Sequence, residues 1–385
     1  MKKACIVFLI DALGWEILAK SGVEFPEFRE KRRLKTVLGY SGAAIPSLLS
    51  GRPPGETGHW AMYFHAPQSS PFSATRLVSW LPRRILRRKL SSAFLKWLVE
   101  VRAGIKGYYS LYEIPFEYFR FFDLCEKKNI FSENGLNACP NIFDELSGNG
   151  IEYRVWDWRA REEENFKEFT QELRAGILQF FFFYTPELDA VIHKFGTGSE
   201  RVVEKLRLLS EMVTESAQTA SEYYDDVHIL VVSDHGMVDT TSVIDSSVFL
   251  DTVKFSMPDD YLVFLDSTMA RFWFSNKEAR ESFSSRLSAL KSGRILTVDE
   301  LKQLGAYFPD GRFGELIFLT SPGTLIVPSF MGKEPLKAMH GFHPSHPGCD
   351  ALAAGNHSLP DLSSILDIFG LIKSEISWLK RRSET

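Results

Sequence analysis

Continuous apolar runs of strand length recur along the 385-residue chain and are separated by segments long enough to form helices. A strand buried on both faces has such a run, whereas a strand with one face in water alternates apolar and polar residues. Buried strands that alternate with helices form a parallel sheet with helices on both sides. The pattern therefore predicts an α/β fold, with strands at 4–10 (ACIVFLI), 152–156 (EYRVW), 177–184 (ILQFFFFY) and 227–233 (VHILVVS).

Residues 76–130 interrupt this pattern with a run of basic residues among leucines, which predicts a basic helical insertion. Three interpretations remain open for the run. It is a solvated helical face, a funnel that guides an anionic substrate, or, through interleaved side chains such as Trp97, a peripheral contact with an anionic membrane. The basic residues are Arg83, Arg84, Arg87, Arg88, Lys89, Lys96, Arg102 and Lys106.

Residues 251–330 differ again, because their apolar runs are typical of antiparallel strands. YLVFLDSTMARFWF predicts a hairpin, NKEARESFSSRLSAL a helix, and GELIFLTSPGTLIVP further strands. We therefore expect a small α+β cap at 251–330. It would be inserted into an α/β core that comprises residues 1–250 and 331–385.

Composition narrows the class of protein only a little. The net charge is −4, which favours no nucleic-acid partner. The four cysteines (Cys5, Cys125, Cys139 and Cys349) are far apart and form neither a C-x-x-C pair nor a disulfide framework, which fits a reducing compartment. The apolar run before Asp11 is too short for a signal peptide and lacks a cleavage pattern. We expect a cytoplasmic protein.

Acidic and histidine side chains follow the ends of several predicted strands. Ligands of parallel α/β sheets bind beyond the carboxyl ends of the strands, so we expect these side chains to converge on one crevice. Three carboxylates and three imidazoles are suitable donors for two divalent metal ions. The residues are Asp11, Asp189, His193, Asp234, His235 and His340.

Local spacing supports a metal site. Asp189 and His193 are four residues apart, so they would lie on one face of a helix. Asp234 and His235 are neighbours, and both can reach one ion only if the chain turns there, which Gly236 permits. Each motif alone has a plainer interpretation, since Asp11 can cap a helix and the SDHG run can be a simple turn. Their co-occurrence favours a binuclear site.

Four motifs together, IDALGW, SGAAIPSLLSG, YTPELDAVIHKFG with SDHGM, and HGFHP, resemble the alkaline phosphatase superfamily. Within it, the chain is most similar to the type I phosphodiesterase/nucleotide pyrophosphatase branch. The resemblance implies a three-layer α/β/α sandwich with a mostly parallel central sheet. It also implies that Ser41, ten residues before Gly51, is the nucleophile, and that Ser47 and Ser50 are helix residues.

The same resemblance implies two sets of metal ligands. Asp11, Ser41, Asp234 and His235 correspond to the ligands of one ion, and Asp189, His193 and His340 to those of the other. Zinc is the usual metal in this branch, and manganese is the usual metal in the related phosphoglycerate mutases.

The implied function is a two-metal phosphoryl hydrolase, in first place a phosphodiesterase that acts on a small-molecule phosphodiester or pyrophosphate. Coordination to a metal lowers the pKa of a serine, so Ser41 would attack phosphorus in line and form a phosphoseryl intermediate. A helix that begins near Ser41 would add backbone N–H groups for the phosphate. The alternatives are a phosphomonoesterase or phosphotransferase on the same core, also on a lipid-linked phosphate, and a metal-bound scaffold without turnover.

The sequence departs from the family pattern after the nucleophile segment. PGETGHW has Thr57 where the family often has histidine, and Met62 lies where nucleotide pyrophosphatases have a phosphate-binding asparagine. We expect His59 or the loop after it to substitute, so His59 and Met62 are candidate substrate contacts. His343 and His346 lie close to the last metal-ligand motif and are candidates for contacts with the substrate or with a metal ligand.

Overall fold

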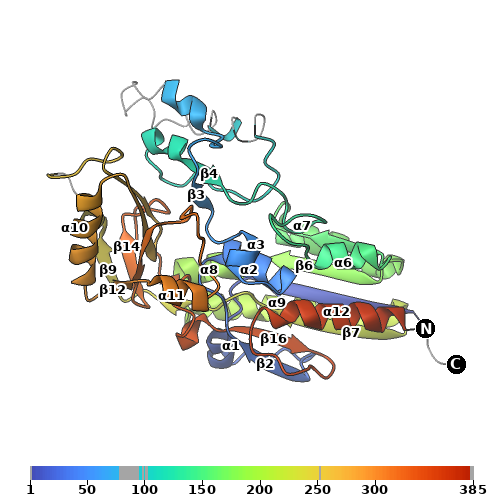
Figure 1. Ribbon diagram of the computed structural model, residues 1–385. Helices are drawn as coiled ribbons and strands as arrows, with labels where there is room; N and C mark the ends of the chain where they lie inside the picture. Colours follow the sequence, from blue (N-terminus) through green and yellow to red (C-terminus); the bar gives the residue numbers. More distant parts are fainter. Residues whose placement is uncertain (1, 78–94, 98, 100–102, 251–252, 382–385) are drawn as a thin grey trace.

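The computed structural model describes residues 2–77, 95–97, 99, 103–250 and 253–381 (Figure 1). At its centre is a six-stranded sheet with the order β2 (Glu30–Leu34), β16 (Ala351–Gly355), β7 (Asp226–Val232), β1 (Lys3–Ile10), β6 (Phe180–Thr185) and β5 (Tyr153–Trp156). The pairs β1–β6, β1–β7 and β5–β6 are parallel, whereas β16 is antiparallel to both of its neighbours. The sheet is therefore mostly parallel, as predicted.

All four predicted strands are confirmed, and they are the four parallel strands β1, β5, β6 and β7. The sequence pattern did not reveal β2 and β16. β2 has the sequence EKRRL and is an edge strand with alternating exposure. β16 has the sequence ALAAG, and its small side chains lack the bulky β-branched residues that mark a strand.

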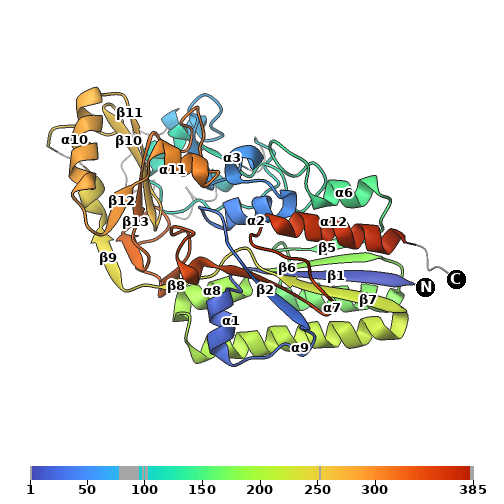
Figure 2. The same ribbon diagram turned by 60° about the horizontal axis from the view of Figure 1, so that its bottom comes forward.

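Helices cover both faces of the central sheet, which confirms the three-layer fold (Figure 2). One face packs against α2 (Ser41–Ser50), α6 (Ile142–Gly148) and α12 (Asp367–Lys380). The other packs against α1 (Trp15–Ser21), α7 (Glu162–Ala175), α8 (Glu187–Phe195) and α9 (Glu200–Tyr223). Successive side chains of a strand point to opposite faces, so Val7 and Leu9 enter the first core and Phe8 and Ile10 the second.

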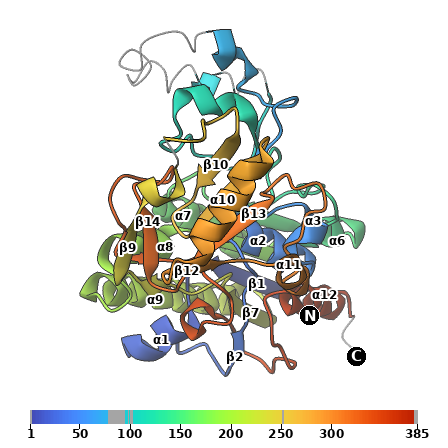
Figure 3. The same ribbon diagram turned by 60° about the vertical axis from the view of Figure 1, so that its left-hand side comes forward.

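A second sheet lies at the end of the molecule opposite the two chain termini (Figures 1 and 3). Its antiparallel strands have the order β10 (Tyr261–Leu265), β11 (Met269–Phe274), β13 (Leu316–Thr320) and β12 (Gly293–Ile295), and α10 (Lys277–Ser288) packs on them. The predicted hairpin is therefore confirmed as β10–β11, and the predicted helix as α10. β14 (Thr324–Val327) instead pairs with β9 (Ser242–Asp245). The boundaries proposed for the cap, 251 and 330, stay a prediction.

The segment between α2 and α6 packs on this second sheet. It contains α3 (Pro54–Thr57), η1 (Ser73–Leu77), η3 (Phe116–Phe121) and the antiparallel pair β3 (Tyr63–His65) and β4 (Phe122–Leu124). Phe122 and Phe264 are in edge contact, with ring centroids 5.0 Å apart. Six of the eight basic residues of the insertion predicted at 76–130 lie in 78–94 and 100–102, outside the described residues, so their helical structure stays a prediction. Residues 103–130 are described, and they form η3 and β4 rather than an α-helix.

The remaining short elements lie in the connections between the strands and helices already named. They are β8 (Val238–Asp239), β15 (Ala338–Met339), α11 (Val298–Gln303), η4 (Ser246–Phe249) and η5 (Pro347–Cys349). In the part of the chain that the structure describes, no helix is both long enough and apolar enough to cross a bilayer.

Candidate active site

Four of the predicted site residues meet where β1 and β7 end and α2 begins. Ser41 is the first residue of α2, Asp11 follows β1, and Asp234 and His235 follow β7. Nε2 of His235 lies 3.0 Å from Oγ of Ser41, 3.4 Å from Oδ1 of Asp11 and 3.2 Å from Oδ2 of Asp234. Oγ of Ser41 lies 3.5 Å from Oδ1 of Asp11. The fold thus brings together side chains that are far apart in the sequence.

Backbone groups fix the orientation of Asp234. Its Oδ1 accepts hydrogen bonds from the N–H groups of His235 (3.0 Å) and Ala12 (3.3 Å). Ala12 is in the left-handed region with φ 62°, a conformation that costs a residue with a Cβ about 1–2 kcal/mol. Oδ2 of Asp234 is buried and accepts no hydrogen bond from the described residues, and it faces Nε2 of His235 at 3.2 Å.

Gly236 serves this turn in a way that the sequence did not predict. It is not among the glycines with a positive φ, so its role is not backbone freedom. A Cβ at this position would lie 2.4 Å from the carbonyl oxygen of Gly348 and 2.9 Å from that of Asp350. Glycine is therefore required because two other backbone segments approach closely behind Asp234 and His235.

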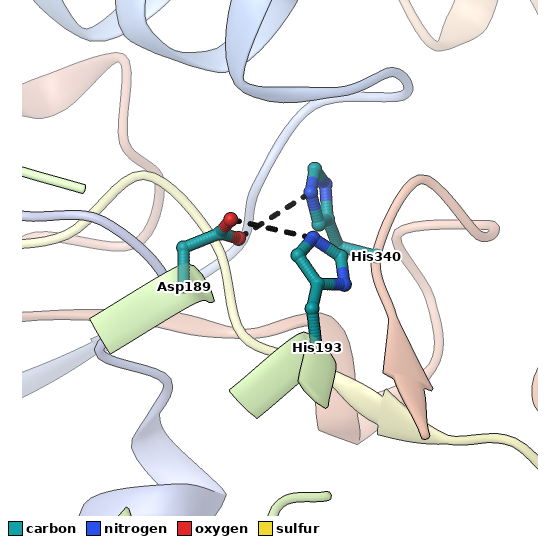
Figure 4. Close-up of side chains that lie close together, drawn as sticks. All are labelled: Asp189, His193 and His340. Carbon is teal, nitrogen blue, oxygen red and sulfur yellow. Dashed lines mark ion pairs between the residues drawn. The ribbon is translucent and has the colours of Figure 1, made fainter. Parts of the chain in front are cut away.

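The other three predicted residues, Asp189, His193 and His340, form a second group (Figure 4). Asp189 and His193 lie one turn apart on α8, as predicted, with Oδ2 of Asp189 3.3 Å from Nε2 of His193. His340 follows β15, and its Nε2 lies 3.5 Å from Oδ1 of Asp189. Nδ1 of His193 donates to the carbonyl oxygen of Ala338 at 2.8 Å. That bond directs Nε2 of His193 toward the carboxylate, as is usual for a metal-binding histidine.

Asp189 connects the two groups. Potential ligand atoms of Asp189, His193 and His340 all lie within 4.8 Å of one another, and the same holds for Asp11, Asp189 and His235. The rings of His235 and His340 stack with centroids 3.8 Å apart. All seven predicted residues therefore face one small volume, in two adjoining groups.

The electrostatics of this volume favour the binding of cations. Burial and the charges of Asp234 and Asp189 raise the pKa of Asp11, and burial, together with the charge of Asp189, raises the pKa of Asp234 to about 7. Burial and the neighbouring imidazoles lower the pKa of His340 well below its ordinary value, so His340 is neutral and able to bind a metal. Oδ1 of Asp189 and Nδ1 of His340 are buried with no hydrogen-bond partner among the described residues. This donor set fits two divalent metal ions.

Tyr184 is a member of the site that the sequence analysis missed. Its hydroxyl donates to Oδ2 of Asp11 at 2.7 Å, which leaves Oδ1 of Asp11 facing Ser41 and His235. Burial and the charge of Asp11 raise the pKa of Tyr184 well above its ordinary value, so the phenol remains a donor at neutral pH. The available signal was the one tyrosine in the FFFFYT run, which lies beside Leu9 in the register of β1 and β6.

A cavity of about 500 Å³ opens in front of these residues. Ser41 and Gly42 at the start of α2 line it together with Asp11, Asp189, His193 and His340. The rest of the lining consists mainly of aromatic, sulfur-containing and acidic side chains, which are Tyr40, Met62, Tyr108, Tyr112, Cys125, Glu126, Phe131, Trp158, Asp266 and Met331. None of these was predicted except Met62, because their loops come together only in the folded chain.

The four candidate substrate contacts separate into two pairs. His59 and Met62 line the cavity. Burial lowers the pKa of His59 to about 4, and its Nε2 accepts a hydrogen bond from the N–H of Asn137. His343 and His346 do not line it. Nε2 of His343 lies 3.2 Å from Oε1 of Glu300, and Nδ1 of His346 accepts from the N–H of Gly348.

A third cluster, His228, His357 and Glu375, is also compact enough for a metal ion. The rings of His228 and His357 are nearly parallel (12°), and their centroids are 3.8 Å apart. A metal ion must lie close to the plane of each imidazole ligand, and one ion cannot lie in two stacked planes. Glu375 instead accepts a hydrogen bond from each ring, at 2.6 and 3.0 Å, so this cluster holds α12 against the sheet.

A mostly parallel sheet between helices, with acids and imidazoles gathered beside a serine at a helix start, defines a metal-dependent phosphoryl hydrolase. The sequence profile described as "Type I phosphodiesterase / nucleotide pyrophosphatase" matches residues 5–345. The chain therefore belongs to this family and is a metal-dependent hydrolase of phosphodiester or pyrophosphate bonds.

Solved structures of two mammalian proteins have the same fold. Murine ectonucleotide pyrophosphatase/phosphodiesterase 5 matches with a TM-score of 0.69 and 13% identity, over 97% of this chain and 95% of that one. The human protein matches with a TM-score of 0.69 and 12% identity, over the same shares of the two chains. An inactive variant of the murine protein, in complex with AMP, matches with a TM-score of 0.66 and 14% identity, over 97% and 95%. A comparison with curated protein sequences finds no significant match.

Proposed function

We propose that this phosphodiesterase uses Ser41 as its nucleophile and forms a phosphoseryl intermediate. The observation that carries the proposal is the position of Oγ of Ser41. It lies at the start of α2, 3.0 Å from Nε2 of His235 and 3.5 Å from Oδ1 of Asp11, beside a buried group of acids and imidazoles. Ser47 and Ser50, the other serines of α2, are buried, and neither lines the cavity.

The residues that would hold the metal ions are the seven gathered side chains. Asp11, Ser41, Asp234 and His235 would hold one ion, and Asp189, His193 and His340 the other. Zinc is the metal we favour over manganese, because imidazoles together with carboxylates suit a borderline ion. When bound, the two ions would lower the pKa of the serine and neutralise charge on the phosphoryl oxygens.

The side chains of the protein then define two displacements. Oγ of Ser41 forms a bond to phosphorus while the bond from phosphorus to the leaving oxygen breaks, and the alcohol or phosphate departs. Water attacks the phosphoserine in the second step, breaks the bond from phosphorus to Oγ and releases the phosphate product. The N–H groups of Ser41 and Gly42 precede that of Ala43, the first in α2 to donate to the carbonyl oxygen of Tyr40, so these two can donate to phosphate oxygens during both steps. Tyr184 would keep Asp11 in place through its hydrogen bond.

The substrate is a small-molecule phosphodiester or pyrophosphate. A nucleotide is one candidate class, because the murine relative binds AMP in its inactive form. A monoesterase or phosphotransferase reaction on the same core is the alternative, and it differs in the acceptor of the phosphoserine. A scaffold without turnover is the least favoured hypothesis, since it gives no reason for buried acids to face one another.

We also propose that the protein is cytoplasmic. It is supported by the four cysteines, which are all free thiols, three of them buried. Peripheral contact with a membrane through residues 83–106 is a separate hypothesis, which concerns a segment that is largely outside the described residues.

The test is hydrolysis of bis(p-nitrophenyl) phosphate by the wild type and by Ser41→Ala, with zinc or manganese added. We expect the variant to lose activity by at least about 1,000-fold. Ser47→Ala is the matched control in the same helix and should remain within about twofold of the wild type. Brief acid quenching with a labelled substrate should trap label on the wild type but not on Ser41→Ala. Equal rates for Ser41→Ala and the wild type would refute Ser41 as the nucleophile.

A further inference from the structure

The turn that joins β10 to β11 is buried, although connecting segments usually run over the surface. Its residues, 266–268, are at most 7% exposed. The turn reaches two backbone positions beside the candidate site, which are Tyr40, the residue before Ser41, and Gly341, the residue after His340. Buried polar groups destabilise a fold unless they are hydrogen-bonded. The hydrogen bonds of this turn therefore show which parts of the molecule it connects.

Thr268, the last residue of the turn, contacts both of these positions. Its Oγ1 donates to the carbonyl oxygen of Gly341 at 3.0 Å and lies 2.7 Å from the hydroxyl of Tyr40. Its backbone N–H donates to the same Tyr40 hydroxyl at 3.1 Å. The carbonyl oxygen of Thr268 accepts from the backbone N–H and from Oγ1 of Thr320 in β13, at 3.0 and 3.1 Å. One residue thus joins the antiparallel sheet to both sides of the site.

The proton positions in this group follow from the donors available. A threonine hydroxyl carries one proton, and the carbonyl oxygen of Gly341 can only accept, so that proton lies between Oγ1 of Thr268 and Gly341. The Tyr40 hydroxyl then donates to Oγ1, and its oxygen accepts the N–H of Thr268. The two hydroxyl groups therefore have one consistent arrangement. Linked hydrogen bonds of this kind polarise and strengthen one another.

Gly341 packs tightly against the same two side chains. Its φ is 84°, in the left-handed region that favours glycine. A Cβ at this position would lie 2.6 Å from Cε1 of Tyr40 and 3.0 Å from Oγ1 of Thr268. The ring of Tyr40 also meets the ring of His340 edge-on, with centroids 5.5 Å apart. Tyr40, Thr268 and Gly341 therefore interlock, and a shift of one displaces the others.

Tyr40 carries this contact directly to the proposed nucleophile. Its carbonyl oxygen accepts the N–H groups of Ala43 and Ala44, so Tyr40 fixes the start of α2, where Ser41 lies. Among the described residues, the hydroxyl of Ser41 bonds within the first metal group and makes no hydrogen bond to His340. Attack on phosphorus requires the nucleophile and the metal ligands to be aligned. The interlocked residues supply a link between the two groups from outside the cavity.

From these contacts we propose that Thr268 is a positioning residue that sets the place of Ser41 relative to His340. Through Tyr40 it holds the start of α2, and through Gly341 it holds the backbone beside a proposed metal ligand. Thr268 does not line the cavity, so it acts through these partners. The inference rests on the proposed function of Ser41. It gives the antiparallel sheet a part in the reaction.

Thr268→Val tests this role, because valine has nearly the same shape and lacks the hydroxyl. We expect kcat for bis(p-nitrophenyl) phosphate to fall by about 10–100-fold, since a small displacement of a reacting group is enough for such a loss, with KM within about threefold. Assays at saturating zinc, with the folded fraction measured by near-UV circular dichroism, exclude loss of folded protein as the cause. A wild-type kcat per folded molecule, even with a lowered Tm, would overturn the positioning role.

Two further threonine variants calibrate this result. Thr268→Ser keeps the hydroxyl and should restore kcat to within about threefold of the wild type. Thr324→Val removes another buried hydroxyl, which lies in β14 and pairs with Oγ of Ser242 at 2.7 Å. It should lower Tm and keep the wild-type kcat. A loss of kcat in Thr324→Val as large as that in Thr268→Val would overturn the inference.

Tyr40→Phe tests the other half of the hydrogen-bonded group, and it takes the place of Thr268→Val if that variant does not fold. It removes the hydroxyl that joins Tyr40 to Thr268, so kcat should fall by a similar factor. The double variant should lose little more than either single variant, because both remove the same link. Losses that multiply in the double variant would overturn the shared role.

Zinc binding separates failure of this inference from failure of the proposed function. If the wild type hydrolyses no ester, the proposed function fails, and calorimetry with zinc alone then tests the positioning role. We expect Thr268→Val to bind one zinc ion about tenfold more weakly than the wild type does, because Gly341 adjoins His340. In that case, unchanged zinc affinities in Thr268→Val would overturn the inference.

Discussion

The hydroxyl of Tyr184 donates a 2.7 Å hydrogen bond to Oδ2 of Asp11, from the strand next to the one that Asp11 follows. Tyr184 thereby determines which oxygen of Asp11 faces Ser41 and His235. Both partners are largely buried and line the cavity in front of Ser41. This hydrogen bond therefore links the packing of β6 beside β1 to the position of Asp11 next to Ser41.

Tyr184→Phe should weaken the first metal group. The variant keeps the ring and removes only the donor, so Asp11 is free to rotate away from the ion. Loss of such an outer hydrogen bond typically costs about 10–100-fold in metal affinity or activity. Zinc titration followed by activity measures the effect, with Tyr153→Phe on the neighbouring strand as the control. Wild-type zinc affinity in Tyr184→Phe would contradict the orienting role.

Metal removal should make stability depend on pH in an unusual direction. The pKa of Asp234 is raised to about 7 in the fold, above the ordinary value of 3.8. The folded apoprotein therefore binds this proton more tightly than the unfolded chain does, so its stability falls as pH rises from about 4 to 7. Bound metal compensates the charge, and the gain in Tm on adding zinc should be larger at pH 8 than at pH 5. Thermal unfolding with chelator or with zinc, at pH 5 and pH 8, checks this prediction. Equal Tm values for the chelator-treated and the zinc-loaded protein at pH 8 would count against the metal site.

Two glycine substitutions should have opposite effects. Gly236→Ala places a Cβ 2.4 Å from the carbonyl oxygen of Gly348, so it should displace the Asp234–His235 turn and destabilise the fold. Gly370→Ala lies in α12 with nothing within 4 Å of the new atom, and it should stabilise the protein by about 0.5–1 kcal/mol. Urea unfolding of both variants, with a metal analysis of Gly236→Ala, measures the contrast. Full metal occupancy in Gly236→Ala would contradict the close-approach argument.

Glu375→Gln should destabilise the protein far from the active site. Burial raises the pKa of Glu375, but hydrogen bonds from His228 and His357 outweigh burial and lower it below the ordinary 4.5. The stabilisation is therefore present above pH 4.5 and is lost as pH falls through the pKa of the folded state. We expect a loss of about 1.5–3 kcal/mol at pH 7 and a smaller loss near pH 4. Chemical unfolding at the two pH values tests this, and equal losses would exclude the charge as the cause.

The pattern of apolar residues predicted the four parallel strands of the central sheet but not the two strands β2 and β16. β1, β5, β6 and β7 are continuous apolar runs, which are local signals of burial on both faces. β2 and β16 carry no such signal, because one is polar and the other consists of small residues. Their place in the sheet depends on pairing with each other over more than 300 residues of separation.

The sequence by itself determined which residues would gather at the candidate site. Polar side chains that end or closely follow buried parallel strands lie at one edge of the sheet, so Asp11, Asp189 and Asp234 could be placed without coordinates. Only the tertiary structure decided what surrounds them. Tyr184, Glu126 and the rings of the cavity reach the site through long-range packing of loops and strands, and no local period or spacing encodes such contacts.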